Sequence, residues 1–251
     1  DLTGIGLGDR GGSKLFETFI EGKCDFLQSL RLGDNGLTDL AVGRLIVEAM
    51  RNESCNISTL DLNNNQIGAH VVTQAIKFNK SLTSLDIMGA PIDDDGLGII
   101  GELLLQPHCP CAMRFVSCFA FDAKDGASDI ALHSEYIGEG AMRLLSGIFK
   151  YNNLVQKLNL SAKGIEPSAA SVMAVSVEHN TTLTSLDLSG NPLAEVSQYT
   201  RSKEPHDTKG LYALADAVKA NKHLLGVTLD GGRLPVDQLK GEDGDKKVRY
   251  L

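Results

Sequence analysis

The chain contains no tryptophan, and only 5% of its 251 residues are aromatic. It also lacks any apolar run of roughly 18 residues, the length that indicates a membrane-spanning helix, so we expect no membrane association. Positive charge is scarce, with 24 Lys and Arg against 32 Asp and Glu and a net charge of −8. Nonspecific nucleic-acid binding needs clustered positive charge to displace counterions from phosphate. We therefore expect no nucleic-acid partner.

Cysteine is sparse and odd in number, which does not indicate a disulfide framework. This favours a reducing, intracellular compartment, the cytoplasm. Asn-x-Ser/Thr sequences would instead favour secretion, but we attribute them to Asn and Ser recurring within a repeated unit. The cysteines are Cys24, Cys55, Cys109, Cys111 and Cys118, and the Asn-x-Ser/Thr sequences begin at Asn52, Asn56, Asn79, Asn159 and Asn180.

What the chain has in abundance is a repeat. Apolar residues recur in the pattern L-x-x-L-x-L-x-x-N-x-L, and the copies begin at residues 27, 57, 82, 113, 155, 183 and 224. Three copies keep the asparagine, as Asn35, Asn65 and Asn191. A recurring period of this length indicates stacked supersecondary units rather than one compact core.

Each copy predicts a strand followed by a helix. The L-x-x-L-x-L segment places its leucines on the inner side of a short strand, and an apolar stripe at helical spacing follows, as in Ala41, Leu45 and Ala49. A single unit cannot bury both faces, so neighbouring units must stack into a parallel sheet covered by helices. The predicted strands are 28–32, 58–62, 83–87, 114–118, 156–160, 184–188 and 225–229.

The segments SLTSLDIMGA at 81–90 and TLTSLDLSGNPL at 182–193 resemble the leucine-rich-repeat family, in its ribonuclease-inhibitor-like class. The resemblance implies one α/β domain over 1–251, with about seven full repeats and a partial repeat at each end. It implies a right-handed solenoid, a horseshoe with parallel strands on its concave face and helices on its convex face. It also implies that the concave sheet binds protein partners, and it implies no catalytic residue, cofactor or metal.

Two insertions interrupt the period, near 122–136 and 194–209, and both are polar and rich in turn-forming residues. We expect loops at one edge of the ladder, either functional or mobile. At the ends, Leu2 matches the place of Leu32, and Val248 and Leu251 have the spacing of a new strand. These matches predict a piece of a longer chain, or a domain that other chains continue.

Two motifs could suggest other chemistry. G-x-G-x-x-G occurs at residues 6–11 and 96–101, but the repeat's own turn explains the first and the second falls in a predicted helix, so we do not infer a nucleotide site. Cys109-Pro110-Cys111 has neither the spacing nor the partners of a zinc site. Cys118 fills a leucine place, so we expect it in the core as a free thiol.

The candidate partner-binding residues lie on the outward side of the strands. Asp61, Asp86 and Asp187 share one place in the repeat, and no nucleophile accompanies them, which argues against an enzyme. Phe115 takes an outward place and Phe119 follows that strand, with Met88 on the unit before. These apolar side chains form either an exposed binding centre or a cluster that the 122–136 insertion covers.

The sequence thus predicts a non-catalytic scaffold, or a subunit of a larger assembly, that binds a protein partner of basic character through the concave sheet and the inserted loops. One alternative is a regulator of a small GTPase, because Ran GTPase-activating protein is built from the same class of repeat. Another is the sensing segment of a NOD-like receptor.

Overall fold

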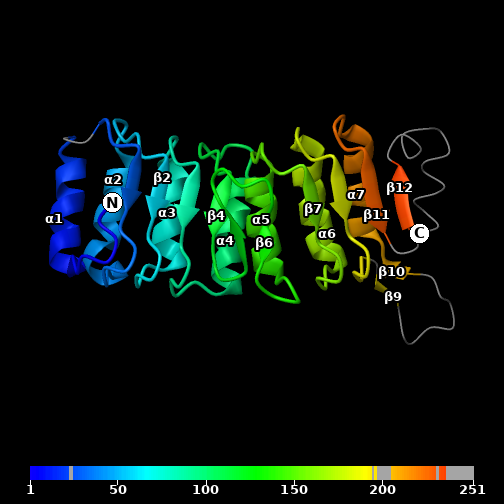
Figure 1. Ribbon diagram of the computed structural model, residues 1–251, viewed down its shortest axis with the longest axis horizontal. Coiled ribbons are helices and arrows are strands. Elements are labelled where there is room, and N and C mark those ends of the chain that lie inside the picture. Colours follow the sequence, from blue (N-terminus) through cyan, green and yellow to red (C-terminus); the bar gives the residue numbers. More distant parts are fainter. Residues whose placement is uncertain (23–24, 194, 197–204, 230–231, 236–251) are drawn as a thin grey trace.

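The computed structural model describes the chain except residues 23–24, 194, 197–204, 230–231 and 236–251. Short strands alternate with helices along the chain (Figure 1). The helices are α1 (Gly8–Ile20), the π-helix η1 (Asp39–Gly43), α2 (Arg44–Arg51), α3 (Ala69–Phe78), α4 (Asp94–Leu105), α5 (Glu139–Phe149), α6 (Pro167–His179) and α7 (Lys209–Ala220).

The repeat strands are β1 (Ser29–Arg31), β2 (Thr59–Asp61), β3 (Ser84–Asp86), β4 (Phe115–Ser117), β7 (Lys157–Asn159), β8 (Ser185–Asp187) and β11 (Gly226–Leu229). Each lies within a range predicted from the leucine spacing, so the strand prediction is confirmed at all seven places. Five further strands lie outside the repeat pattern: β5 (Phe121–Ala123), β6 (Ala131–Leu132), β9 (Glu195–Val196), β10 (Pro205–Asp207) and β12 (Gly232–Pro235).

The central apolar residue of each repeat strand, leucine in five of the seven, points into a layer between strands and helices. Leu30, Leu60 and Leu85 are paired across β1, β2 and β3, and each is buried. Burying one such side chain contributes about 2 kcal/mol, so stacked units stabilise each other through this row. The helices form the second layer behind the strands (Figure 1). We call the side of the strands turned away from the helices the strand face.

The strands do not form one continuous parallel sheet. β1 to β4 pair in parallel, but β5 and β6 then continue this sheet in antiparallel order. A second sheet has the order β12-β11-β8-β7, in which β7, β8 and β11 are parallel and β12 is antiparallel to β11. The insertion near 122–136 was predicted to be a loop, and this is wrong in part, because its start and middle supply β5 and β6. Its pairing occupies the edge of β4 that would otherwise receive β7.

The repeat asparagine holds the turn that follows a repeat strand. Asn65 is fully buried; its Oδ1 accepts hydrogen bonds from the N–H groups of Asn35 (3.3 Å) and Leu37 (2.9 Å), and its Nδ2 donates to the carbonyl of Leu32 (2.9 Å). The side chain thus satisfies the backbone of the preceding turn. In the fourth unit the same place holds Phe121, which is buried and cannot make these bonds. In this unit the chain also turns back into β5, which pairs with β4 in antiparallel order.

A second set of asparagines lies where helices end. Asn79 and Asn180 are buried, and their Nδ2 atoms donate to the carbonyls of Met50 (2.9 Å) and Phe149 (2.7 Å) in the preceding units. Asn152 likewise donates to the carbonyl of Arg114 (3.0 Å), across the break between the two sheets. Two of the Asn-x-Ser/Thr sequences thus hold buried structural side chains, as their attribution to the repeat anticipated.

Consecutive helices are also joined by aspartates. The carboxylate of Asp94 at the start of α4 accepts hydrogen bonds from the N–H groups of Gly140 and Ala141, both at 2.9 Å, at the start of α5. Asp39 accepts from the Gly68 N–H (3.0 Å) in the same way. An aspartate here satisfies N–H groups that a helix start leaves free and favourably meets the positive end of the helix dipole.

At the N-terminus, the N–H of Leu2 donates to the Arg31 carbonyl at 2.9 Å, so this residue runs beside β1 as its place in the repeat predicts.

In the second insertion, β9 and β10 pair in antiparallel order. Val248 and Leu251 lie outside the described residues. None of the described helices is long and apolar enough to cross a bilayer. The horseshoe curvature and the single domain stay predictions.

Candidate binding surface on the strand face

The strand face carries two rows of side chains set by the parallel register. One row runs through the first residue of each strand, pairing Ser84 with Phe115, and the other pairs Asp61 with Asp86 and Asp86 with Ser117. Paired residues of neighbouring strands are roughly 5 Å apart in backbone. The second row therefore brings Asp61 and Asp86 side by side, as predicted. Asp187 lies on β8 in the second sheet.

Each of these aspartates accepts a hydrogen bond from the backbone two residues further along the chain. Asp61 Oδ1 accepts from the Asn63 N–H (2.9 Å), Asp86 Oδ1 from the Met88 N–H (2.9 Å) and Asp187 Oδ1 from the Ser189 N–H (3.0 Å). Each carboxylate thus closes the turn two residues beyond its own strand. All three remain half-buried, so the same groups present negative charge to a partner.

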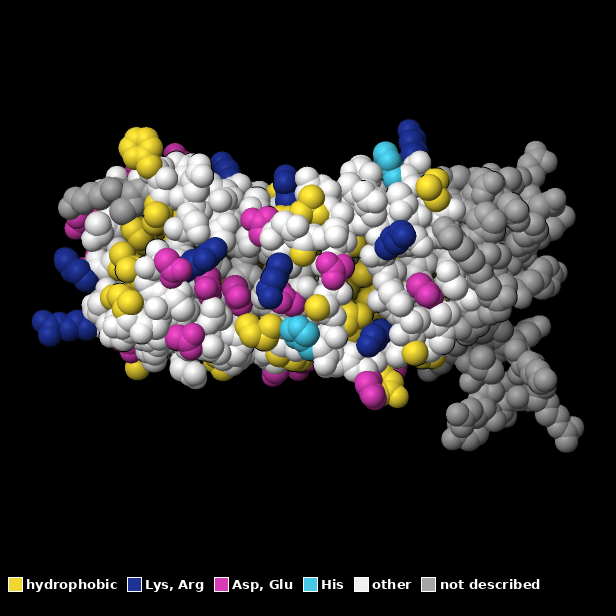
Figure 2. All heavy atoms as spheres, viewed as in Figure 1, with side chains coloured by type: hydrophobic (Ala, Val, Ile, Leu, Met, Phe, Trp, Pro, Cys, Tyr) yellow, Lys and Arg dark blue, Asp and Glu magenta, His cyan; other side chains and the backbone are white. Residues whose placement is uncertain are grey.

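The insertion adds a charged network at the middle of this face. Ser117 is paired with Asp122 across β4 and β5, and its Oγ donates to Asp122 Oδ1 at 2.6 Å. The Lys124 ammonium lies 2.8 Å from Asp122 Oδ2. Asp61, Asp86, Ser117, Asp122 and Lys124 therefore form one polar surface, which we call the acidic row. Figure 2 shows acidic side chains among basic ones along the face that the strands present in Figure 1.

The acidic row shifts the pKa values of its members in opposite directions. Burial raises the pKa of Asp86, the Met88 N–H opposes this, and the carboxylates of Asp61 and Asp122 raise it further. For Asp122 burial acts in the same sense, but the hydrogen bonds from Lys124 and Ser117 outweigh it and lower the pKa below the usual value. The pKa of Lys124 is raised by its bond to Asp122. Negative charge is thus more costly at Asp86 than at Asp122.

The predicted apolar centre is only partly present. Phe115 is 6% exposed, so it is not the exposed ring that one alternative required. It lies on the strand face and outside the main core cluster, and β5 and β6 of the insertion follow its strand in the sheet. Coverage of the ring by the insertion is therefore the alternative that the structure favours. Phe119 is 46% exposed and Met88 is half-buried.

Sequence reasoning identified the insertion but missed Ser117, Asp122 and Lys124 as neighbours of Asp86. The available signal was the alternation of Phe121, Asp122 and Ala123, which is the apolar-polar period of a strand. The antiparallel pairing of this strand with β4 brings Asp122 opposite Ser117. The polar, turn-rich composition of the insertion indicated a loop and so concealed this pairing.

The remaining motifs have structural explanations. Burial raises the pKa of Cys111 to about 12 and that of Cys118 to about 11, so both thiols stay protonated in the core. The described residues contain no cluster of His, Cys, Asp and Glu suited to a metal ion. In the second G-x-G-x-x-G segment, Gly98 and Gly101 lie on α4 against α5, where an added Cβ at Gly98 would come 3.2 Å from Gly140 Cα. These glycines serve helix packing.

Comparison with known proteins agrees with this geometry. A family model described as leucine-rich repeat matches residues 53–69, 78–98 and 179–194. The chain is 25% identical over 185 residues to pig (Sus scrofa) ribonuclease inhibitor, covering 67% of this chain and 40% of that protein. It is 25% identical over 193 residues to human "NACHT, LRR and PYD domains-containing protein 5", covering 67% of this chain and 16% of that protein.

A rat (Rattus norvegicus) relative, "NACHT, LRR and PYD domains-containing protein 3", is 30% identical over 138 residues, covering 54% of this chain and 12% of that protein. The chain thus spans less than half of the length of these relatives. A solved structure of leiomodin-1 actin-binding site 2 aligns at 15% identity over 82% of this chain and 91% of that chain, with a TM-score of 0.29. The chain thus contains leucine-rich repeats and is similar to proteins of the ribonuclease-inhibitor-like class.

Proposed function

We propose that this chain is a non-catalytic module that binds a basic protein partner across the acidic row of the strand face. The observation that carries the proposal is the continuous polar row from half-buried Asp61 on β2 to exposed Lys124 at the end of β5, held in place by strand pairing, a short hydrogen bond and an ion pair. Such preorganised charge speeds encounter with an oppositely charged partner and fixes its orientation.

The exposed side chain of Phe119 and the half-buried Met88 supply apolar area beside these charges. In protein interfaces, most of the binding energy commonly comes from a few apolar contacts that charged and polar residues surround. We therefore place Phe119 at the contact and assign Phe115 a supporting role beneath the insertion. Asp187 would extend the same surface along the second sheet.

The proposal is tested with a partner captured by the immobilised chain and then purified. Asp61→Asn removes one negative charge from the acidic row, and we expect about fivefold weaker binding at low ionic strength and a smaller loss at high salt. Lys124→Ala removes the cation from the network and should strengthen binding of the same partner. Asp216→Asn on α7 is the matched control, because it makes the same charge change on the exposed helix layer.

Isothermal titration at two salt concentrations measures these effects, with folding checked by circular dichroism. Opposite signs for Asp61→Asn and Lys124→Ala support the proposal. Weakening by Lys124→Ala together with strengthening by Asp61→Asn would assign an acidic partner to this face. Equal, small effects from all three variants would move the binding surface off the strand face.

The matches to NACHT, LRR and PYD domains-containing proteins favour a second candidate, the sensing segment of a NOD-like receptor. The two candidates share the binding surface and differ in what adjoins it. Sequencing the full-length transcript discriminates between them, because the receptor requires a nucleotide-binding domain in the same polypeptide.

A further inference from the structure

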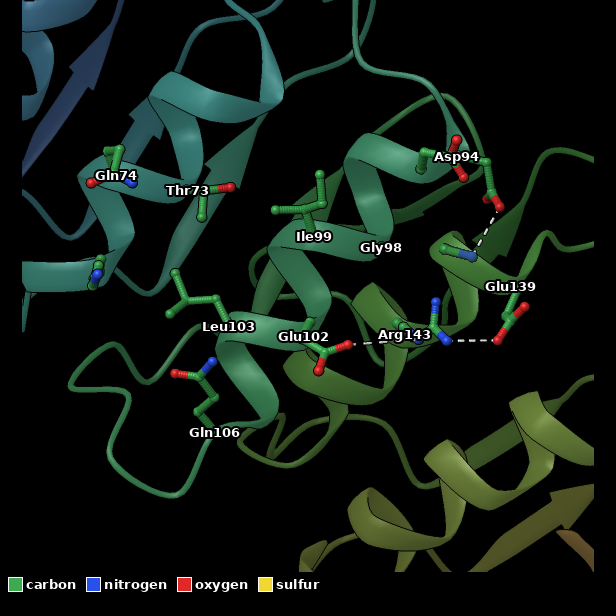
Figure 3. Close-up of a pocket in the computed structure, with 13 residues that line it drawn as sticks. Thr73, Gln74, Asp94, Gly98, Ile99, Glu102, Leu103, Gln106, Glu139 and Arg143 are labelled. Carbon is green, nitrogen blue, oxygen red and sulfur yellow. Dashed lines mark hydrogen bonds and ion pairs between the residues drawn. The ribbon is translucent and has the colours of Figure 1, made fainter.

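The helix layer contains a groove that the strand-face function does not use. It is a cavity of about 640 Å³ between α3 and α4, continued onto α5 (Figure 3). Thr73 and Lys77 of α3 form one wall, and Ile99, Glu102 and Leu103 of α4 form the other. Because it lies among the helices, this groove is on the opposite layer from the acidic row.

The groove opens here because α4 packs unusually closely against α5. Gly98 and Gly101 of α4 contact α5, and any Cβ at Gly101 would overlap the backbone at Arg143. On the α5 side, a Cβ at Gly147 would come 2.8 Å from Leu104 Cβ. Side chains fill the space between α3 and α4 less completely. The glycines of the G-x-G-x-x-G segment thus place Ile99, which stands between them in sequence, on the groove wall.

Ile99 is the apolar feature of the groove, with 57% of its surface exposed beside Leu103, which is buried. An isolated exposed aliphatic residue is ordinary on a protein surface. Here it borders a concave site, where a partner's aliphatic side chain could be surrounded on several sides. Placing such a side chain there removes apolar area from water on both molecules.

The rim of the groove is predominantly acidic. Asp94, Asp95, Glu102 and Glu139 line it, against Lys77 and Arg143. Arg143 Nη2 lies 2.7 Å from Glu139 Oε1, and its Nε lies 4.0 Å from Glu102 Oε2. Dashed lines mark both ion pairs in Figure 3. Asp94 is engaged with the start of α5. Glu102, 72% exposed in its side chain, makes one long ion pair with the described residues and is available to a cation.

We propose that this groove binds a short segment of a partner protein in which an aliphatic side chain is flanked by lysine or arginine. The aliphatic side chain would contact Ile99, and the flanking cations would meet Glu102 and Asp95. Charge complementarity and the exposed apolar wall argue for this occupant over an acidic or wholly polar segment. The inference is independent of the strand-face proposal, because the two surfaces share no residue.

The test uses the whole chain labelled at isoleucine δ1-methyl groups and the N-acetylated, C-amidated probe peptide Gly-Lys-Leu-Lys-Gly. We expect saturable shifts of the Ile99 methyl signal and none of Ile5, which is 59% exposed elsewhere and reports nonspecific contact. The matched peptides Gly-Glu-Leu-Glu-Gly and Gly-Lys-Ser-Lys-Gly test the charge and the aliphatic side chain in turn. Both should leave the Ile99 signal unchanged at the same concentrations.

Glu102→Gln should weaken binding of the lysine-leucine peptide about threefold, since an exposed charge pair contributes only modestly to affinity. Asp216→Asn on α7 is the control and should not change the affinity. Equal shifts at Ile99 and Ile5, equal binding of the glutamate peptide, or unchanged affinity in Glu102→Gln would overturn the proposal. Asp61→Asn should leave peptide binding intact, so this result separates the groove from the strand-face function.

Discussion

Asn65→Ala tests whether the repeat asparagine stabilises the fold by satisfying the backbone of the preceding unit. In the native chain, Asn65 Oδ1 is the acceptor for the N–H groups of Asn35 and Leu37. Both donors are buried, so truncation leaves two N–H groups without an acceptor. Each costs about 1.5 kcal/mol, and the predicted loss in unfolding free energy is about 3 kcal/mol.

Loss of the Nδ2 donor adds to this effect, because the same atom bonds the carbonyls of Leu32, Leu62 and Asn63. Asn65→Asp keeps the acceptor but turns a carboxylate oxygen toward these carbonyls, so it should also destabilise the fold. Urea unfolding followed by far-ultraviolet circular dichroism measures both variants, as the chain has no tryptophan to report by fluorescence. Gln66→Ala is the control, because Gln66 is adjacent and exposed.

A loss below about 1 kcal/mol for Asn65→Ala, or a loss no larger than that of Gln66→Ala, would refute this reasoning. It would mean that water or a rearranged turn replaces the side chain. The ladder of buried asparagines would then mark the repeat without stabilising it.

Three further predictions concern other parts of the chain. Because burial raises the pKa of Asp86 in the folded state, ionising this group destabilises the folded chain at neutral pH, and the effect disappears below the unfolded-state pKa, where both states are protonated. Asp86→Asn should therefore raise the free energy of unfolding above that of the native chain at pH 7 but not at acid pH. Urea titrations of both proteins at the two pH values measure this difference. Cys111 should resist iodoacetamide at pH 8 in the folded chain while half-buried Cys109 reacts faster, as mass spectrometry of alkylated peptides measures; equal rates would contradict the assigned burial. Gly140→Ala should lower the free energy of unfolding by about 2 kcal/mol, and with it the thermal midpoint, because the added Cβ would overlap the Asp94 backbone. An unchanged midpoint in calorimetry would show that α4 and α5 can move apart without cost.

The sequence predicted the repeat strands correctly because their signal is local. Leu183, Leu186 and Leu188 define a strand by spacing alone, and β8 lies there. The pairing of Asp61 with Asp86 followed, since equivalent places in neighbouring units must align. These predictions need only the period and the geometry of a parallel sheet.

The parts that could not be predicted depend on contacts between units. The spacing around Phe121 showed a degenerate repeat, but not that the chain reverses and pairs with β4. The contact of Ser117 with Asp122 follows from that reversal. The groove beside Ile99 was hidden for a similar reason, because glycine spacing alone does not reveal which helix the glycines approach.

The interruption between β4 and β7 has a consequence for how the chain unfolds. In a repeat protein, cooperativity is transmitted through the interfaces of adjacent units, and each lost interface term weakens it locally. Here no backbone ladder joins the two sheets among the described residues. Coupling at this point rests on contacts between α5 and α6 and on bonds such as that from Asn152 to Arg114. The units before and after the interruption should therefore melt as two cooperative blocks, with hydrogen exchange rates that differ across the boundary.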